Sequence, residues 1–221
     1  MRRSDLGCNA YYHIFTRSIA EYRIFNSEEE YVRMRMVMEY YKTKRPLKFS
    51  HYLLFCNNSD QKESKEEEKR VEIIAYCIMP THIHLVLKQI KDKGISTFMS
   101  NILNSYTHYF NITHKRKGPL WESRFKHLLI DSDEYLLHLT RYIHLNPVIA
   151  GLVEKPELWE FSSYKEYIGV RQNGDNLCNF KEVLEISSNS YKEFVESGIM
   201  IQKEIARIKH LLLEEFSIRE R

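Results

Sequence analysis

The sequence has few cysteines and no long apolar run. No apolar stretch approaches the roughly 20 residues that a membrane-spanning helix needs, and residues 1–5 lack the apolar character of a signal peptide. The four cysteines, Cys8, Cys56, Cys77 and Cys178, show no paired spacing, which disfavours both a zinc knuckle and a disulfide framework. We therefore expect a cytoplasmic protein that neither enters a membrane nor is exported.

A large excess of one charge is also missing. The chain has 33 lysines and arginines against 30 aspartates and glutamates, for a formal net charge of +3. This excess is too small to predict nucleic-acid binding by itself, so the local clustering of charge has to decide. With 43% hydrophobic residues among 221, the chain can build a real core and fits one domain with appendages.

Two histidines separated by one residue, His82 and His84, are the most informative pair in the chain. They lie in an apolar, β-prone run, and alternate side chains of a strand leave the same face, so both imidazoles project to one side. A histidine in a strand is more often a hydrogen-bonded core or surface residue than a ligand. The context favours a metal site here. The β-prone segment 71–78 and the turn residues 79–81 predict a hairpin, and the histidine pair lies at the start of its second strand.

The rest of the pattern alternates between strands and helices. The order strand, helix, strand, strand, helix, strand is the split βαβ arrangement of a ferredoxin-like sandwich, an α+β fold in which helices cover one face of an antiparallel sheet. We expect the other face to be free to hold a site. The predicted strands are 11–17, 71–78, 82–87 and 124–130, and the predicted helices are 27–44, 94–110 and a third that begins near 133.

Two segments fall outside this alternation. Residues 57–70 are polar and highly charged without an apolar face, so we interpret them as a solvated insertion. The tail has the spacing of an amphipathic helix, which suits packing on the core, a dimer contact or a DNA contact equally well. We therefore divide the chain into a main domain, 1–170, and a helical C-terminal extension, 171–221.

The third predicted helix carries Tyr142 and Asn146, which are four residues apart and share one face. Pro147 leaves the geometry just beyond Asn146 open. By default the tyrosine would be a half-buried packing residue and the asparagine a C-terminal cap. A phenol and a carboxamide oxygen on one face can also act together at one place.

In this context the sequence resembles a known family. The histidine pair resembles the motif of the single-tyrosine HUH transposases, and the run 76–85 closely resembles their REP-associated branch. Thr81 stands where that family usually has asparagine, a departure that affects the turn and not the metal site. Further segments resemble the same branch in the same order, so the likeness spans about residues 11–169; they are 105–111, 118–126, 141–147 and 159–164.

The resemblance implies a division of labour among four residues. His82 and His84 would bind a divalent metal, Asn146 would complete the protein ligands, and Tyr142 would be the nucleophile. The implied activity is nicking and rejoining of single-stranded DNA near hairpins through a 5′-phosphotyrosine. Mixed nitrogen and oxygen ligands favour Mg²⁺ or Mn²⁺. Related enzymes include both monomers and dimers with shared sites, so a homodimer stays open.

Positive charges and aromatic rings gather between residues 109 and 126. Cations on phosphates and aromatic faces under bases are what hold single-stranded DNA, and the resemblance favours single-stranded or hairpin DNA as the partner. A charge run is more often a solvated face, and a tryptophan is often core. The candidate DNA contacts are Lys115, Arg116, Lys117, Trp121, Arg124 and Lys126.

Two rival functions remain. The first is a catalytically idle, domesticated protein that binds hairpin nucleic acid, against which the intact set of four site residues argues. The second is a metal-dependent phosphoesterase that uses water in place of tyrosine, for which the sequence offers no acidic cluster of metal ligands. Whether DNA is cut, and whether the protein stays attached to it, separates all three functions.

Overall fold

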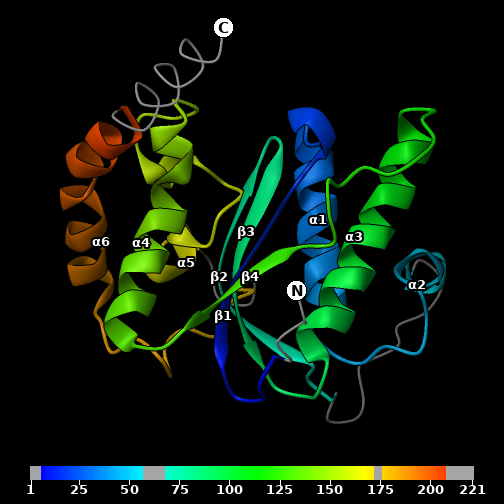
Figure 1. Cartoon of the computed structure of the whole chain (residues 1–221), viewed down its shortest axis with the longest axis horizontal. Coiled ribbons are helices and arrows are strands. Elements are labelled where there is room, and N and C mark those ends of the chain that lie inside the picture. The colour runs from blue at the N-terminus through cyan, green and yellow to red at the C-terminus, as the bar shows by residue number, and fades with distance from the viewer. Residues whose placement is uncertain (1–5, 57–67, 172–175, 208–221) are drawn as a thin grey trace, which may run out of the picture.

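The computed structural model describes residues 6–56, 68–171 and 176–207, which form an α+β fold around one antiparallel sheet (Figure 1). The strand order is β2-β3-β1-β4, and each neighbouring pair is antiparallel. This is the strand order of the split βαβ sandwich, so the predicted fold class is confirmed. The strands are β1 (Tyr11–Arg17), β2 (Val71–Met79), β3 (His82–Gln89) and β4 (Lys126–Ile130).

The hairpin of β2 and β3 turns at Pro80 and Thr81, with Met79 paired to His82. Nearly all of β2 is buried, although it lies at the end of the sheet. A later segment, 161–163, covers its open edge, because Ile78 N–H donates to the Phe161 carbonyl and Ser163 N–H donates to the Tyr76 carbonyl. The apolar character of β2 thus follows from cover on both faces and along its edge.

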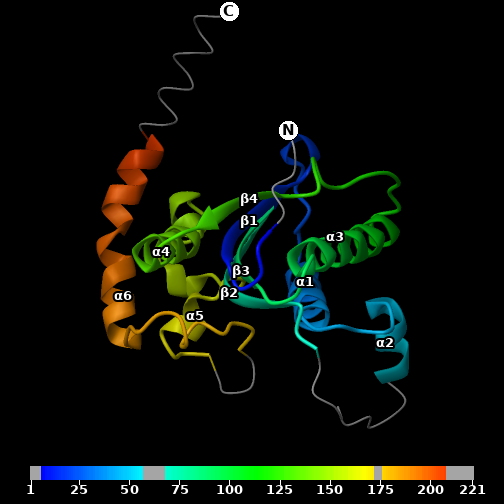
Figure 2. The ribbon, with the colours of Figure 1, turned by 60° about the horizontal axis from the view of Figure 1, so that its bottom comes forward.

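Helices α1 (Glu28–Tyr41) and α3 (Gly94–Thr113) pack against one face of the sheet (Figure 2). Both were predicted, and their apolar positions recur at helical spacing because this face is buried. A short helix, α2 (Phe49–Cys56), follows α1 and was not predicted. The main core lies between these helices and the sheet, and its sheet residues include Ile14, Ile73, Tyr76, Ile83, Leu85 and Leu87.

Helix α4 (Asp133–Ile149) lies on the opposite face of the sheet, so the expectation that this face is free was wrong (Figure 2). The sheet places apolar residues such as Cys77 and Val86 there, and they require a partner because exposed apolar surface is unfavourable. Ser132 caps the helix by accepting a hydrogen bond from Tyr135 N–H at 3.2 Å. The helix continues through Pro147, so Tyr142 and Asn146 share a face as predicted.

The C-terminal extension packs on α4 through α6 (Ser188–Ser197), and helical residues continue from 199 to 207. Tyr191 and Val195 of α6 are fully buried, which favours core packing among the three possibilities. The predicted insertion lies mostly outside the described residues, as does the end of the tail. Short elements complete the chain: η1 (Ile19–Glu21), η2 (Pro156–Leu158) and α5 (Tyr164–Tyr167). No helix in the described ranges is long and apolar enough to span a membrane.

A buried histidine connects α4 to the extension. His144 Nδ1 lies 2.6 Å from the Tyr191 hydroxyl, and Nε2 lies 2.7 Å from Ser163 Oγ. Burial lowers the pKa of His144 from 6.5 to about 3, because the charged ring is costly away from water. Its neutral form therefore joins three segments, α4, α6 and the cover of β2.

We expect His144 to make the protein less stable as the pH falls. Its pKa is lower in the folded state than in the unfolded state, so below about pH 6.5 the unfolded chain binds the extra proton and stability is lost. Between pH 7 and pH 5, His144 should lower the free energy of unfolding by about 2 kcal/mol. Urea unfolding of the wild type and of His144→Gln at both pH values measures it. The variant should lose less stability than the wild type, and equal losses would contradict the expectation.

Candidate active site

The pairing of β1 with β3 places a set of side chains on the α4 face of the sheet. Arg17 lies opposite His82, and Phe15 lies opposite His84. Opposite residues in an antiparallel pair project from the same face, so His13, two positions before Phe15, joins them. The histidine pair therefore lies on the side of the sheet that α4 covers.

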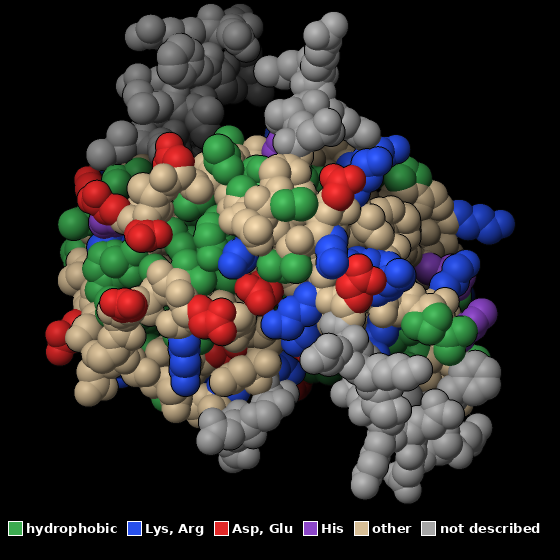
Figure 3. All heavy atoms as spheres, turned by 90° about the horizontal axis from the view of Figure 1, so that it is seen from below, with side chains coloured by type: hydrophobic (Ala, Val, Ile, Leu, Met, Phe, Trp, Pro, Cys, Tyr) green, Lys and Arg blue, Asp and Glu red, His purple; other side chains and the backbone are tan. Residues whose placement is uncertain are grey.

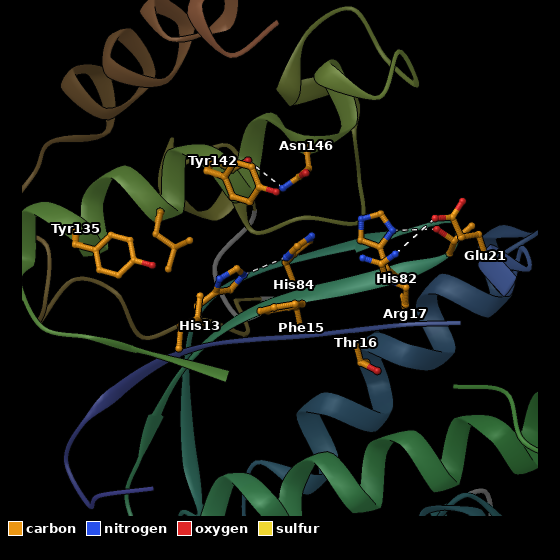
Figure 4. A pocket seen from close by; sticks show the side chains of 13 residues that line it. His13, Phe15, Thr16, Arg17, Glu21, His82, His84, Tyr135, Tyr142 and Asn146 are labelled. Atoms are coloured by element: carbon orange, nitrogen blue, oxygen red, sulfur yellow. Dashed lines mark hydrogen bonds and ion pairs between the residues drawn. The ribbon is translucent and has the colours of Figure 1, made fainter. Parts of the chain in front are cut away.

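Helix α4 encloses this face and forms a pocket of about 640 Å³ (Figure 4). Tyr142 and Asn146 project from the helix toward the two histidines of β3, and the rings of His84 and Tyr142 meet edge to face at 5.9 Å. The four residues singled out in the sequence thus line one cavity. The lining residues are His13, Phe15, Thr16, Arg17, Glu21, Thr81, His82, His84, Leu128, Tyr135, Leu139, Tyr142 and Asn146.

Both histidines of the pair use Nδ1 within the protein. His82 Nδ1 lies 3.0 Å from the Thr81 hydroxyl, and His84 Nδ1 lies 3.1 Å from His13 Nε2. No described residue forms a hydrogen bond with Nε2 of either ring. Each Nε2 is therefore available to a ligand in the pocket.

Burial keeps these imidazoles neutral. It lowers the pKa of His82 and lowers that of His84 well below 6.5, and the nearby Arg17 charge adds to both shifts. Burial also lowers the pKa of His13 to about 4. A metal binds only the neutral imidazole, so the protein presents these rings in the form that a cation requires.

The phenol of Tyr142 is partly buried beside the Asn146 amide (Figure 4). Burial raises its pKa above 10, and the neighbouring Asn146 side chain opposes part of that rise. Asn146 Nδ2 donates to the Tyr142 carbonyl at 3.1 Å, which leaves the amide oxygen for another partner. The phenol is protonated at neutral pH, so it needs help to act as a nucleophile.

The donor set fits a divalent cation. His82, His84 and Asn146, which carry two neutral imidazoles and one amide, line the same cavity, and such a mixed set with open positions for water suits Mg²⁺ or Mn²⁺. Within the described ranges no group of three or more His, Cys, Asp or Glu side chains is placed to hold a metal. A site here therefore depends on Asn146 or on water beside His82 and His84.

Two residues at this site were not singled out in the sequence, His13 and Arg17. Strand alternation placed them on one face of 11–17, but only the register with β3 brings them to the histidine pair. Arg17 pairs with Glu21 at 3.6 Å and with Glu122 at 3.5 Å, while remaining half exposed. It is a cation at the pocket rim that can exchange a carboxylate for a phosphate.

The predicted DNA contacts do not gather in this pocket. Lys126 lies opposite Phe15 on β4, whereas Trp121 and Arg124 line a second cavity, of about 690 Å³, beside α3. Trp121 is only 9% exposed and donates to the Leu103 carbonyl, so its ring offers little surface to a base. On the part of the surface seen in Figure 3, acidic side chains are more frequent on the left and basic ones on the right, and the two mix near the centre.

The basic run after α3 is exposed at Lys115 and Lys117. Arg116 instead holds its own loop, because its guanidinium donates to Asn111 Oδ1 at 3.0 Å and to the Pro119 carbonyl at 2.7 Å. The two lysines are therefore free to contact a phosphate, while the arginine shapes the segment that presents them.

Other tyrosines and histidines differ from Tyr142 in their surroundings. Tyr106 is fully buried on the far side of the sheet and donates to the Ile24 carbonyl. His138, one turn before Tyr142, contacts Arg141 and the ring of Phe194 outside the pocket. Tyr135 does line the pocket and is 37% exposed, so it is the matched control for Tyr142.

Comparison with known proteins shows what this chain is similar to. Residues 58–146 match the family model described as "Transposase IS200 like", a range that contains all four site residues. The chain is 32% identical over 103 residues to a candidate REP-associated tyrosine transposase of Haemophilus influenzae. That match covers 42% of this chain and 58% of the relative, less than two thirds of its length.

A solved structure extends the likeness to the fold. It is a REP-associated tyrosine transposase bound to a REP hairpin, with a TM-score of 0.56 and 18% identity, covering 84% of this chain and 97% of the other. The resemblance to the single-tyrosine transposases is thus confirmed. Within that class, both relatives are of the REP-associated branch that the sequence motifs indicated.

We expect the histidine pair to bind Mn²⁺ through the two Nε2 atoms. His82→Ala and His84→Ala should each weaken Mn²⁺ binding at least tenfold, because each removes one of the few protein ligands. Isothermal titration with MnCl₂ measures the affinity, with His138→Ala as a control that lies outside the pocket. Equal affinity in the double alanine variant and the wild type would contradict the metal assignment.

Proposed function

We propose that this protein is a metal-dependent transposase that nicks and rejoins single-stranded DNA near hairpins through a 5′-phosphotyrosine. One observation carries the proposal: His82 and His84 of β3 and Tyr142 and Asn146 of α4 line a single pocket. The two pairs are about sixty residues apart in the chain and come from opposite sides of the cavity (Figure 4). The likeness to REP-associated tyrosine transposases supports the same reading.

Tyr142 performs the covalent step. Its phenolic oxygen attacks the scissile phosphorus and the bond from phosphorus to the 3′ oxygen breaks. The proton that the phenol loses is balanced by the one that the 3′ oxygen gains, so the cut strand ends in a free 3′ hydroxyl. The 5′ phosphate stays on Tyr142, so the phosphodiester energy is kept for rejoining and no nucleotide cofactor is needed. The phenol projects from α4, and its partly buried ring meets the ring of His84 edge to face, which directs it toward the histidine pair.

His82, His84 and Asn146 are proposed as the protein ligands of Mg²⁺ or Mn²⁺. A bound cation supplies Lewis-acid stabilisation of the charge that develops on the phosphate. The protein holds the two imidazoles neutral by burial and aims each Nε2 into the pocket through a fixed Nδ1 contact. Arg17, at the rim, is proposed to hold a neighbouring phosphate of the strand.

The proposed partner is a DNA hairpin with its flanking single strand. The solved relative is bound to a REP hairpin, and this chain presents exposed Lys115, Lys117, Arg124 and Lys126 around the segment between α3 and β4. Lys126 lies on the site face of the sheet. These cations are proposed to contact the phosphates, whereas buried Trp121 takes a packing role.

The absence of a carboxylate-rich metal centre in the described residues argues against a phosphoesterase that activates water. Such an enzyme would cut DNA without forming a covalent bond to it. An idle binding protein would instead bind the hairpin and leave it uncut. The covalent adduct therefore separates the proposal from both alternatives.

Tyr142→Phe should abolish the adduct while preserving fold and DNA affinity. The substitution keeps the ring and its contact with His84 and removes only the attacking oxygen. A denaturing gel after incubation with hairpin-containing single-stranded DNA and Mn²⁺ detects the adduct, and peptide mapping locates it. The control is Tyr135→Phe, which removes another phenol from the same pocket and should leave adduct formation unchanged.

Other outcomes of that experiment would overturn the assignment. Undiminished adduct in Tyr142→Phe, or a 5′ phosphate mapped to Tyr135, would move the nucleophile to another residue. Cleavage without attached protein would favour the phosphoesterase. Binding without cleavage in the wild type would favour the idle protein.

Replacing the exposed lysines of the basic run should weaken DNA binding and flatten its salt dependence. Lys115→Gln with Lys117→Gln removes two charges and keeps Arg116, which shapes the loop. The negative slope of log affinity against log salt should become shallower by about 1.4, because each charge removed releases about 0.7 fewer counterions from a single strand. Fluorescence anisotropy between 50 and 200 mM salt measures it. The matched control is Lys155→Gln with Lys181→Gln, two exposed lysines outside the segment between α3 and β4. Equal slopes in both variants would contradict the expectation.

A further inference from the structure

We propose that His13 is a positioning residue for the metal site, which fixes the ring of His84 and its tautomer so that Nε2 faces the cation. This inference rests on the proposed function, because it assigns a partner to one of its metal ligands. His13 belongs to a different strand from the histidine pair and lies about seventy residues earlier in the chain. Nothing in the pattern of His82 and His84 points to it.

The geometry holds the two rings together. His13 Nε2 lies 3.1 Å from His84 Nδ1, and the rings stack with centroids 5.3 Å apart and planes 21° apart. Phe15 contacts both rings, at 5.0 Å from His13 and 6.1 Å from His84. His13 itself is 7% exposed on β1, which pairs with strands on both sides. Its ring is therefore fixed by the sheet and by packing.

The hydrogen bond has two possible directions, and only one is compatible with a metal. If His84 binds a cation through Nε2, that atom must present a lone pair, so the hydrogen of the neutral ring sits on Nδ1. His84 Nδ1–H then donates to His13 Nε2, and His13 carries its own hydrogen on Nδ1. In the reverse direction His84 carries its hydrogen on Nε2 and cannot bind the cation there.

His13 Nε2 must therefore accept the hydrogen bond that His84 Nδ1–H donates. Metal-bound histidines commonly donate their second N–H to such an acceptor, which orients the ring and raises its basicity. His82 has an equivalent partner, because its Nδ1 lies 3.0 Å from the Thr81 hydroxyl. Each proposed imidazole ligand therefore has one neighbouring side chain within hydrogen-bond distance of its Nδ1, on the side of the ring away from the cation.

His13 is not itself a third imidazole ligand. Its Nε2 faces His84 Nδ1 and not the open pocket. Among the described residues His13, His82 and His84 do not form a group placed to hold one metal ion. Its effect on the cation is therefore transmitted through His84.

Three substitutions at one position test the acceptor role. Gln places an amide oxygen near the position of Nε2, Asn is too short to reach it, and Leu removes the hydrogen bond while filling space. His13→Leu and His13→Asn should weaken Mn²⁺ binding by about 10- to 100-fold, and His13→Gln should recover most of that loss. The control is His138→Leu, which replaces a histidine outside the pocket that contacts Arg141 and Phe194, and it should change affinity less than threefold.

The measurements are titration of each variant with MnCl₂ and thermal unfolding without metal. A purely structural role would lower the melting temperature of all variants and give Gln no advantage over Asn in metal affinity. That result, or wild-type affinity in His13→Leu, would overturn the inference. Rescue by Gln alone supports it.

The unaltered protein offers a test that does not depend on variant folding. Nitrogen-15 NMR of histidine-labelled protein with Mg²⁺ should show His84 with its hydrogen on Nδ1, assigned by comparison with His84→Gln. A hydrogen on Nε2 would overturn the inference.

The outcomes also separate this inference from the proposed function. Failure of the wild type to bind Mn²⁺ would overturn both. Metal binding that depends on His13, in a protein that never forms a DNA adduct, would support the inference and remove the nicking activity. Normal metal affinity in all His13 variants, with adduct formation intact, would remove only the role of His13.

Discussion

The antiparallel register between β1 and β3 is the constraint on which the candidate site depends. It sets Phe15 opposite His84 and Arg17 opposite His82, and both strands are central in the sheet. A slip of one residue would turn every side chain of one strand to the other face. The apolar residues that alternate with these, Ile14 and Ile83, would then lose their place in the core. Because exposing that core is unfavourable, the register is strongly preferred. The register in turn places Arg17 beside His82 and Phe15 beside His84.

Helix α4 contributes the other half of the pocket and is itself held in several ways. Ser132 caps its start, its apolar face packs on the sheet, and His144 ties it to α6 and to the segment that covers β2. His144 lies between Tyr142 and Asn146 in the sequence but projects away from the pocket. One turn of helix thus combines residues that anchor it with residues that face the site. The C-terminal extension therefore belongs to the support of the site.

Burial sets the chemistry of the pocket residues. It keeps the three imidazoles neutral and the phenol protonated. Neutral imidazoles are good metal ligands, whereas a protonated phenol is a weak nucleophile. A site of this kind gains reactivity when a cation polarises the phosphate. In the proposed reaction, burial thus keeps the imidazoles in the form that binds a cation and would make Tyr142 depend on that cation.

The sequence by itself determined the four strands, the helices α1, α3 and α4, and the four residues that came to line the pocket. β-prone runs predicted the strands, helical spacing predicted α1, α3 and α4, and the motifs indicated His82, His84, Tyr142 and Asn146, because these signals are local. Tertiary structure decided that α4 covers the second face of the sheet and that Trp121 is core. It also decided that His13 meets His84 across more than seventy residues of chain. Such contacts arise from strand pairing and from the burial of apolar faces, and no short stretch of sequence records which surfaces will meet.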